Sequence, residues 1–232
     1  MVSILLLTVD RLELLQRCVQ SILQHTTTPY EIVFILQNSP PEIVNYVESV
    51  PCSKQVHRFD TNVGITPGRN KAMEMARGEY LVFFDDDAFV VENDGPDWLD
   101  RMLKFFEDTS VGVVSPGGGY VDTKQRGVFP ACKTAGAECD VGQGYCFMFR
   151  KSMLSDVGYL DPYFAKVWHE ESEYALRAKA FGYKVIHAGG IGVWHRGSSS
   201  GDDGTYFDKY DYMMNKWSEH FRRILVPRSQ RQ

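Results

Sequence analysis

The chain of 232 residues lacks any apolar run of the length that a membrane-spanning helix needs, about 18 residues or more. Residues 1–7 are apolar but lack the basic start and the small-residue cleavage site of a secretion signal. Both absences predict a cytoplasmic protein. An excess of positive charge is also missing, because 25 basic residues stand against 30 acidic ones, a net charge of -5. That balance argues against nucleic-acid binding.

Cysteine is sparse, and no two cysteines have the CxxC spacing. The five cysteines are an odd number, which is typical of a chain kept in a reducing compartment. Cys132, Cys139 and Cys146 are evenly spaced, but more widely than the ligands of common zinc sites, so zinc binding is the less favoured interpretation. No internal repeat or low-complexity linker divides the chain, and its length suits a single domain.

The first half of the chain alternates apolar β-type segments with helical patterns. Strands are expected at residues 2–8, 31–36, 55–59 and 80–84. The first of them is continuously apolar, as in a strand buried on both faces. Helices are expected between the strands, with N-caps at Asp10 (in a capping box with Glu13), Ser39 and Thr66. This order predicts an α/β fold with a mostly parallel central sheet flanked by helices on both faces.

The second half has a mixed pattern. Helices are expected at residues 97–107 and 170–181, strands at 111–115, 144–150 and 184–187, and a loop at 116–119. Near the C-terminus, large apolar residues recur at helical spacing, at Tyr206, Tyr210, Met213 or Met214, Trp217 and Phe221. We expect this last helix to pack on the core, with a solvated basic end that contains Arg222, Arg223, Arg228 and Arg231. Weak attachment to an anionic membrane is the less favoured alternative.

Three consecutive aspartates, Asp85, Asp86 and Asp87, follow the fourth expected strand. Ligands of parallel α/β sheets bind beyond the carboxyl ends of the strands, where residues 8–11 and 37–39 should also converge. Side chains alternate along an extended chain, so Asp85 and Asp87 can face one side and Asp86 the other. A cation relieves the repulsion between carboxylates, and oxygen ligands suit Mg²⁺ or Mn²⁺ that bridges to phosphate. A solvated acidic turn is the alternative, which the preceding apolar strand disfavours.

A second polar cluster contains Asn62, Gly64, Arg69 and Asn70. Glycine permits close backbone approach to a ligand, and the planar guanidinium of Arg69 suits a phosphate group. Taken alone, however, a loop glycine and a surface arginine are the plainer interpretation.

Two clusters in the second half also carry reactive side chains. His169, Glu170, Glu171 and Glu173 open a helix, where acidic residues often only complement the helix dipole. The functional alternative is a general base that deprotonates a hydroxyl, although the helix N-terminus should lower the pKa of such a carboxylate.

The other cluster is His195 with Arg196, which precedes a small polar run at residues 197–201. This run could close over a diphosphate, and Arg196 could neutralise charge on a leaving group. A structural histidine is the commoner outcome for such a pattern.

In this order the motifs resemble those of a GT-A glycosyltransferase, and the chain is similar to glycosyltransferase family 2 over roughly residues 2–200. A single Asp-x-Asp motif is a weak signal, but the whole series in order is strong. The matching segments are residues 7–11, Asn62-Val63-Gly64, Gly68-Arg69-Asn70, Gly78-Glu79-Tyr80, Phe84-Asp85-Asp86-Asp87, residues 158–161, Glu170 with Glu171, Glu173 and Arg177, and His195.

The resemblance implies a GT-A (Rossmann-like) domain over 1–232, with a nucleotide-sugar-binding half (1–87), an acceptor-binding half (88–205) and a C-terminal helix and tail (206–232). It implies Mn²⁺ or Mg²⁺ held by Asp85, Asp87 and His195, and an inverting transfer with Glu171, or else Glu170, as the base. The donor would be a UDP-sugar, with GDP or dTDP as alternatives, and the acceptor a glycan, a lipid-linked glycan or a small molecule. The implied donor-binding residues are Thr8, Asp10, Arg11, Gln37, Asn38, Asn62, Gly64, Arg69, Asn70, Asp85, Asp86 and Arg196.

This sequence departs from the family pattern at two places. Gln37 stands where the family usually has an aspartate that helps to hold the base, so the identity of the donor base is open; glutamine has both a donor and an acceptor. The usual Glu-Asp pair is here Glu170-Glu171. Glu171 matches the usual base, but its longer side chain shifts the carboxylate, and Glu170 remains a rival.

Three other functions stay open at this point. A retaining transferase is compatible with the same fold and metal. A sugar nucleotidyltransferase would normally have a glycine-rich first loop, and residues 8–11 contain no glycine. A non-catalytic module that binds nucleotide sugars is the third alternative.

Overall fold

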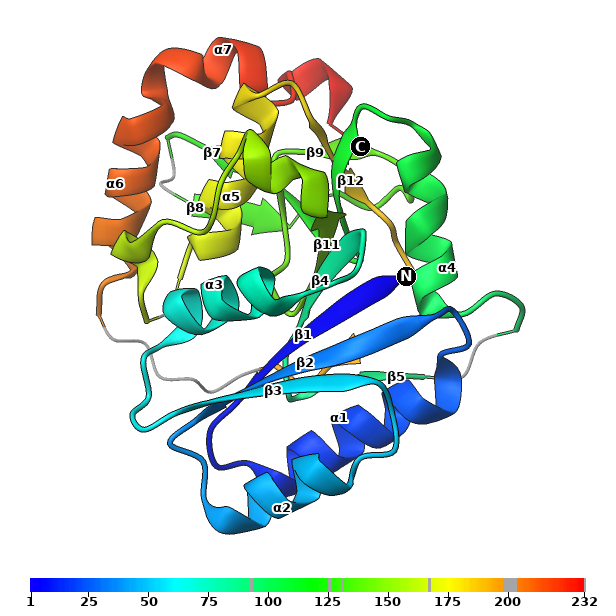
Figure 1. The fold of residues 1–232 in the computed structure, drawn as a ribbon. Helices are drawn as coiled ribbons and strands as arrows, with labels where there is room; N and C mark the ends of the chain where they lie inside the picture. Colours follow the sequence, from blue (N-terminus) through cyan, green and yellow to red (C-terminus); the bar gives the residue numbers. More distant parts are fainter. Residues whose placement is uncertain (92–93, 125–126, 131, 167, 198–203, 232) are drawn as a thin grey trace.

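The central sheet of the computed structural model contains eight strands in the order β3-β2-β1-β4-β11-β6-β12-β9, counted over the described residues (Figure 1). These residues are 1–91, 94–124, 127–130, 132–166, 168–197 and 204–231. Four parallel strands form one side of the sheet, as predicted: β1 (Val2–Thr8), β2 (Tyr30–Gln37), β3 (Lys54–Phe59) and β4 (Tyr80–Phe84). Three helices connect them: α1 (Leu12–His25), α2 (Pro41–Ser49) and α3 (Ile65–Met75).

Strands β1, β2 and β4 are buried on both faces, which explains their apolar sequences, whereas β3 is an edge strand that is only half-buried and carries polar residues. In β1, Ile4 and Leu6 pack with α1 and α2 on one face, whereas Leu5 packs with α3 on the other. All three side chains are almost fully buried. Burial of one such side chain stabilises the fold by about 1.5–3 kcal/mol, so the alternation fixes which residues of β1 reach each helical layer.

The rest of the sheet is mixed, because β11 (Cys146–Arg150) runs antiparallel to both β4 and β6 (Val111–Ser115). At the far edge, β12 (Lys184–His187) is parallel to β6, and β9 (Glu138–Cys139) is antiparallel to β12. The helix expected at residues 97–107 consists of α4 (Trp98–Leu103) and a 3-10 turn, η1 (Lys104–Glu107). Asp97 caps α4 by accepting hydrogen bonds from the backbone of Leu99 and Asp100.

Two small sheets lie beside the central one. The first has the order β10 (Val141–Gly142), β7 (Gly118–Asp122) and β8 (Gly127–Pro130). The loop predicted at residues 116–119 is therefore wrong at its end, where Gly118 already begins β7. The second small sheet pairs β13 (Val193–His195) with β5 (Ala88–Val90), directly after the aspartates.

The three predicted N-caps are wrong. The side chains of Ser39 and Thr66 bond to distant backbone oxygens, and the side chain of Asp10 lies in solvent. Asp10 is exposed, and Arg11 stands at the N-cap of α1, where its side chain makes no capping hydrogen bond. Ser39 donates to the backbone oxygen of Thr8, and Thr66 donates to that of Phe164. The latter bond ties the start of α3 to the second half of the chain.

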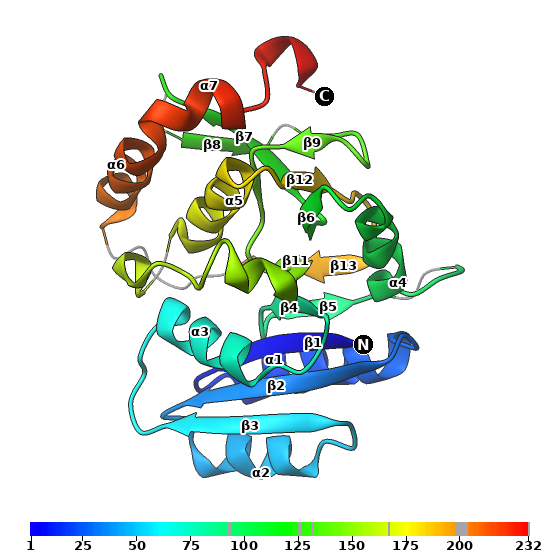
Figure 2. The same cartoon turned by 45° about the horizontal axis from the view of Figure 1, so that its top comes forward.

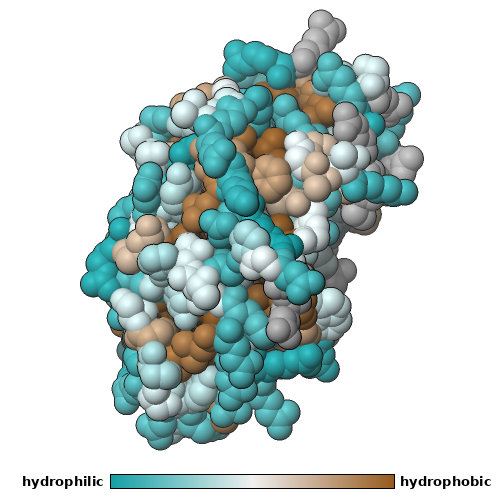
Figure 3. Space-filling model, turned by 90° about the vertical axis from the view of Figure 1, so that its right-hand side faces the viewer, coloured by the Kyte–Doolittle hydropathy of each residue, from teal (hydrophilic) through white to brown (hydrophobic). Residues whose placement is uncertain are grey.

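The C-terminal helices α6 (Tyr206–Trp217) and α7 (Phe221–Ile224) cover α5 (Glu170–Ala180) (Figure 2). Tyr210 and Met213 are buried in the same core as α5. This packing agrees with the favoured interpretation of the apolar stripe. Within the described part of the chain, none of the helices is both long enough and apolar enough to span a bilayer. On the face drawn in Figure 3, hydrophobic residues form patches interrupted by hydrophilic ones.

Candidate functional site

Asp85, Asp87 and His195 gather at the carboxyl end of β4. The pairing of His195 with Ala88 brings β13 over the turn that follows β4. The imidazole Nε2 lies 3.0 Å from Asp87 Oδ1 and 3.8 Å from Asp85 Oδ2. One ligand atom from each of the three residues lies within 4.8 Å of the other two. The three metal ligands implied by the resemblance are thus close enough to share one ion.

Asp86 is not one of the three residues whose ligand atoms gather, but the alternation predicted for an extended chain does not apply, because the aspartates form a turn and Asp86 lines the same cavity as Asp87. Thr8 Oγ1 donates to Asp86 at 2.8 Å, and Arg11 contacts both Asp86 and Asp87. Burial raises the pKa of Asp86 to about 6 in spite of these partners. Burial also opposes the ionisation of Asp87, but the hydrogen bond and the charge of His195 outweigh it and lower the pKa of Asp87. Asp87 therefore stays ionised beside the imidazole.

The donor set fits a divalent cation. Two carboxylates and one imidazole within a few ångströms match the ligands that Mn²⁺ accepts, and the carboxylates match Mg²⁺. The ring of Tyr145 stacks on that of His195, with the ring centroids 4.6 Å apart and the planes at 7°. This stacking fixes the imidazole plane, so the ligand atom is already oriented toward the carboxylates.

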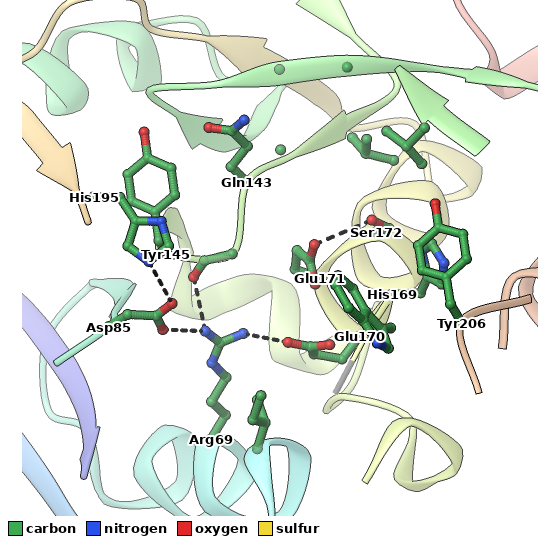
Figure 4. Close-up of a pocket in the computed structure, with 18 residues that line it drawn as sticks. Arg69, Asp85, Gln143, Tyr145, His169, Glu170, Glu171, Ser172, His195 and Tyr206 are labelled. Atoms are coloured by element: carbon green, nitrogen blue, oxygen red, sulfur yellow. Dashed lines mark hydrogen bonds and ion pairs between the residues drawn. The ribbon is translucent and has the colours of Figure 1, made fainter. Parts of the chain in front are cut away.

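Arg69 connects this cluster to the acidic start of α5 (Figure 4). Its guanidinium donates to Asp85 Oδ1 and Glu170 Oε1, each at 3.0 Å, and to the backbone oxygen of Gly144 at 2.9 Å. The side chain is buried and lies over the ring of Phe83. The sequence pointed to a phosphate ligand, but the structure engages Arg69 with protein oxygens.

Glu170 and Glu171 differ in their surroundings. Glu170 is buried and paired with Arg69, whereas Glu171 is half-buried, accepts a hydrogen bond from Ser172 Oγ at 3.4 Å and lies beside Glu170. Gly144 leaves space for Glu171, because an added Cβ would lie 3.2 Å from the carboxyl carbon. Burial and the neighbouring Glu170 raise the pKa of Glu171 to about 8. The expectation that the helix N-terminus lowers this pKa is therefore wrong.

Two adjoining cavities share Ile65, Arg69 and Asp85 as a common wall. The larger cavity, of about 610 Å³, lies along the carboxyl ends of β4, β1 and β2. Nine of the residues implied for the donor or the metal line it: Thr8, Arg11, Gln37, Asn62, Gly64, Arg69, Asp85, Asp86 and Asp87. The smaller cavity, of about 460 Å³, contains Glu170, Glu171 and His195. Sequence order alone had predicted this convergence.

Four implied donor residues are not among those that line these cavities. Asp10 and Asn38 are exposed. Asn70 bonds to both backbone groups of Leu160, so it ties α3 to the segment before α5. The side chain of Arg196 is exposed, while its backbone N–H donates to the carbonyl of Asp87. Of the polar run at residues 197–201, positions 198–201 lie outside the described residues.

The structure explains why residue 64 is a glycine, for a reason that the sequence did not reveal. Its φ is +89°, and an added Cβ would lie 2.2 Å from the backbone oxygen of Ala165. The backbone that approaches Gly64 so closely therefore belongs to the second half of the chain, and this segment also lines the larger cavity.

The sequence did not indicate one wall of the smaller cavity. This wall comes from the short strands β7, β8 and β10 and from aromatic residues near α5 and α6: Gly118, Gly119, Val128, Val141, Gly142, Gln143, Tyr145, Trp168 and Tyr206. Strands of two to five residues that are rich in glycine have too little periodicity to be recognised. The aromatic residues at 168 and 206 come together only through the packing of α6 on α5.

His169 gives a prediction about stability. Its side chain is buried, and burial together with Lys209 lowers its pKa from 6.5 to about 4. A histidine held neutral stabilises the fold above pH 6.5, and this stability is lost as the pH falls toward 4. His169→Asn cannot titrate, and asparagine tolerates the left-handed backbone at this position, where φ is 69°.

Between pH 7.5 and 4.5 we expect the free energy of unfolding to fall further in the wild type than in this variant, by on the order of 2 kcal/mol. Urea unfolding at the two pH values measures the difference. Equal losses in both proteins would contradict the assignment.

Solved structures with the same architecture are GT-A glycosyltransferases. A mannosyltransferase from Pyrobaculum calidifontis, in complex with GDP-Man and Mn²⁺, matches with a TM-score of 0.69 and 18% identity, over 97% of this chain and 65% of that one. GalNAc-T7 with UDP, GalNAc and Mn²⁺ matches with a TM-score of 0.74 and 16% identity, over 95% of this chain and 48% of that one. At these identities the likeness shows the fold, which is the predicted GT-A fold.

The model of the family described as glycosyl transferase family 2 matches residues 3–158, which is most of the chain. The chain therefore belongs to glycosyltransferase family 2, as the motifs indicated. A glucosyl-dolichyl phosphate glucuronosyltransferase of Haloferax volcanii is 28% identical over 116 residues, which cover 49% of this chain and 36% of that protein. The chain spans about a third or less of the length of the curated relatives that it matches.

Proposed function

We propose that this protein transfers a sugar from a nucleotide-diphosphate sugar to an acceptor hydroxyl, with inversion at the anomeric carbon and with a divalent metal ion. One observation carries the proposal. The cluster of Asp85, Asp87 and His195 and the carboxylate of Glu171 lie in adjoining cavities with a common wall. A donor diphosphate and an acceptor hydroxyl can therefore meet at that wall.

The larger cavity suits the donor. Asp85, Asp87 and His195 would hold Mn²⁺ or Mg²⁺, which when bound supplies Lewis-acid stabilisation of the departing diphosphate. Mn²⁺ also accompanies the nucleotide or nucleotide sugar in the two solved structures named above. A UDP-sugar is the favoured donor, with GDP or dTDP as alternatives.

The smaller cavity suits the acceptor. Glu171 would take the proton of the acceptor hydroxyl as its oxygen attacks the anomeric carbon, on the face opposite the leaving diphosphate. One carbon–oxygen bond forms, the bond to the diphosphate breaks, and the proton stays on Glu171. Arg69 pairs with Glu170, and among the described residues Glu171 has no such ion pair, which favours Glu171 as the carboxylate that accepts the proton. Glycans, lipid-linked glycans and small molecules are the proposed acceptors.

A chelator tests the metal requirement. With EDTA in excess we expect the release of nucleoside diphosphate from nucleotide sugars to cease, and to return when Mn²⁺ or Mg²⁺ is added beyond the chelator. The reason is that the carboxylate of Asp87, whose pKa is lowered, would then repel the diphosphate with no cation between them. Full activity in excess chelator would contradict the proposal.

The same assay separates this function from the alternatives. Metal-dependent hydrolysis of a nucleotide sugar would reject a non-catalytic binding module, because water then replaces the acceptor. The anomeric configuration of a transferred sugar, measured by NMR, would separate inverting from retaining transfer.

A further inference from the structure

We propose that the acceptor is an uncharged sugar whose ring stacks on the indole of Trp168, so that a hydroxyl at the rim of the ring is presented to Glu171. The inference deepens the proposed function and rests on it, because it concerns the substrate of the smaller cavity. It narrows the acceptor from any hydroxyl compound to a sugar ring, either in a free glycan or at the end of a lipid-linked one.

The first observation is the backbone that carries Trp168. Trp168 and His169 have φ angles of 71° and 69°, in the left-handed region that bulky side chains rarely adopt. Apart from glycine, Asn38 is the only other described residue with a positive φ. Backbone strain of this kind clusters at binding sites, where the surrounding structure holds it. Here His169 is buried against Tyr206 and Tyr210, and this anchors the turn that brings Trp168 to the cavity.

The second observation is the surface that Trp168 presents. The residue lines the smaller cavity and is half-buried. Its Nε1 is buried, so a ligand that touches this side chain meets carbon atoms of the indole. The ring of Tyr206 lies 5.4 Å away at an angle of 80° and lines the same cavity. The two rings therefore form an aromatic corner in the cavity wall.

This aromatic surface suits the ring of a sugar. The face of an aromatic ring carries partial negative charge. A pyranose has C–H bonds with partial positive charge on its faces, and its hydroxyls lie around the rim. A sugar stacked on Trp168 therefore keeps its hydroxyls free for polar groups. Glu171 lines the same cavity and follows Trp168 by three positions, so it can accept the proton of such a hydroxyl.

The third observation is the charge of the smaller cavity. Three carboxylates line it, those of Asp85, Glu170 and Glu171. Among the described residues that line it, Arg69 is the only lysine or arginine, and it is already paired with Asp85 and Glu170. A phosphate or carboxylate on the acceptor would find no unpaired lysine or arginine there, and it would lie near the carboxylates. The cavity therefore favours an uncharged sugar over an acidic one.

The response of Trp168 to simple sugars is the first test. NMR of isotope-labelled protein resolves the indole N–H signals of the four tryptophans, and Trp168→Phe identifies the signal of Trp168. The protein, with UDP and Mg²⁺, is titrated with the methyl glycosides of glucose, galactose, mannose and N-acetylglucosamine. We expect at least one of them to shift this signal, whereas sorbitol, which has hydroxyls but no ring, should not. No response to any glycoside would overturn the inference, and so would an equal response to sorbitol.

The second test changes only the charge of the sugar. The uronide of the glycoside that binds has a carboxylate in place of the hydroxymethyl group, and it should bind at least about 10-fold more weakly. Equal or tighter binding of the uronide would overturn the claim that the acceptor is uncharged. The octyl glycoside of the same sugar separates the two sources of the ring. Tighter binding than that of the methyl glycoside supports a lipid-linked acceptor, and equal binding supports a free glycan.

The third test removes the indole. Trp168→Ala should raise the KM for the accepted glycoside by about 10-fold or more and change kcat less, because the ring holds the acceptor but takes no proton. Hydrolysis of the nucleotide sugar without acceptor should keep its wild-type rate, because water needs no stacking surface. Trp168→Phe retains an aromatic face and should lose less. Both variants keep a side chain at the same left-handed φ, so the difference between them reports the ring.

Phe181→Ala is the matched control, because it removes an exposed aromatic side chain just beyond the other end of α5, and it should behave as the wild type does. An unchanged KM in Trp168→Ala would overturn the role of Trp168, as would equal losses in Trp168→Ala and Trp168→Phe. Thermal unfolding checks that the variants are folded, and the titrations of the wild type stand without them. If the wild type hydrolyses no nucleotide sugar with Mn²⁺, the proposed function itself fails. Hydrolysis without any response of Trp168 to glycosides removes only the present inference.

Discussion

Replacement of Glu171 by glutamine is expected to lower turnover by about 10²-fold or more. Glutamine keeps the shape of the side chain but cannot take a proton from the acceptor. Both carboxylates of the pair line the smaller cavity, and among the described residues only Glu170 forms an ion pair there, with Arg69. Transfer or hydrolysis of a nucleotide sugar measures the turnover. The affinity for nucleoside diphosphate with Mn²⁺ should change little, because the proposed donor site is the other cavity.

Glu170→Gln is the matched control, because it makes the same change one residue earlier. It leaves Arg69 without the ionised Glu170 and should change turnover less than Glu171→Gln does. Normal turnover of Glu171→Gln beside an inactive Glu170→Gln would reverse the assignment. Loss of donor affinity in both variants would instead show that the pair holds the donor or the metal.

The pH dependence of turnover should carry the signature of Glu171. A general base is active when ionised, so turnover should rise as the pH passes upward through its pKa. Burial and Glu170 raise this pKa to about 8, so we expect a rise over neutral to mildly alkaline pH. The residual activity of Glu171→Gln should lack that rise. A pH profile of the wild type that is flat from 6 to 9 would contradict the assignment.

Asp87→Ala is expected to weaken metal-dependent nucleotide binding by at least about 100-fold. The substitution removes one of three ligands, and loss of an outer-shell partner alone typically weakens a metal site by 10- to 100-fold. Titration of the nucleotide with and without Mn²⁺ measures the effect. Asp108→Ala makes the same change at an exposed aspartate that pairs with Lys184, and it should bind as the wild type does.

Circular dichroism should show that Asp87→Ala is folded, because Asp87 also contacts Arg11 and His195. Wild-type nucleotide affinity in this variant, with the same dependence on Mn²⁺, would show that the cluster is not the metal site.

The sequence predicted the parallel half of the fold because local and tertiary preferences agree there. Strands β1, β2 and β4 are apolar since both of their faces are covered, and the polar segments after them lie at one rim. The order of the family motifs then placed His195 with the aspartates, although 108 positions separate it from Asp87.

The remaining features depend on contacts that no local pattern records. Ser39 and Thr66 have the composition of N-caps, but they bond to distant backbone oxygens instead. The raised pKa of Glu171 comes from burial and from Glu170, which outweigh the helix N-terminus. The partners of Arg69 could not be read from its neighbours in sequence, because they come from β4, α5 and the segment before β11.

The shared arginine has a thermodynamic consequence. Arg69 divides one positive charge between Asp85 in the larger cavity and Glu170 in the smaller one. A cation that pairs with Asp85 competes with Arg69 for that carboxylate, and this changes how strongly the guanidinium holds Glu170. The free energies of binding in the two cavities are therefore linked, and linkage acts equally in both directions. We therefore expect the proposed donor and acceptor sites to bind their ligands cooperatively.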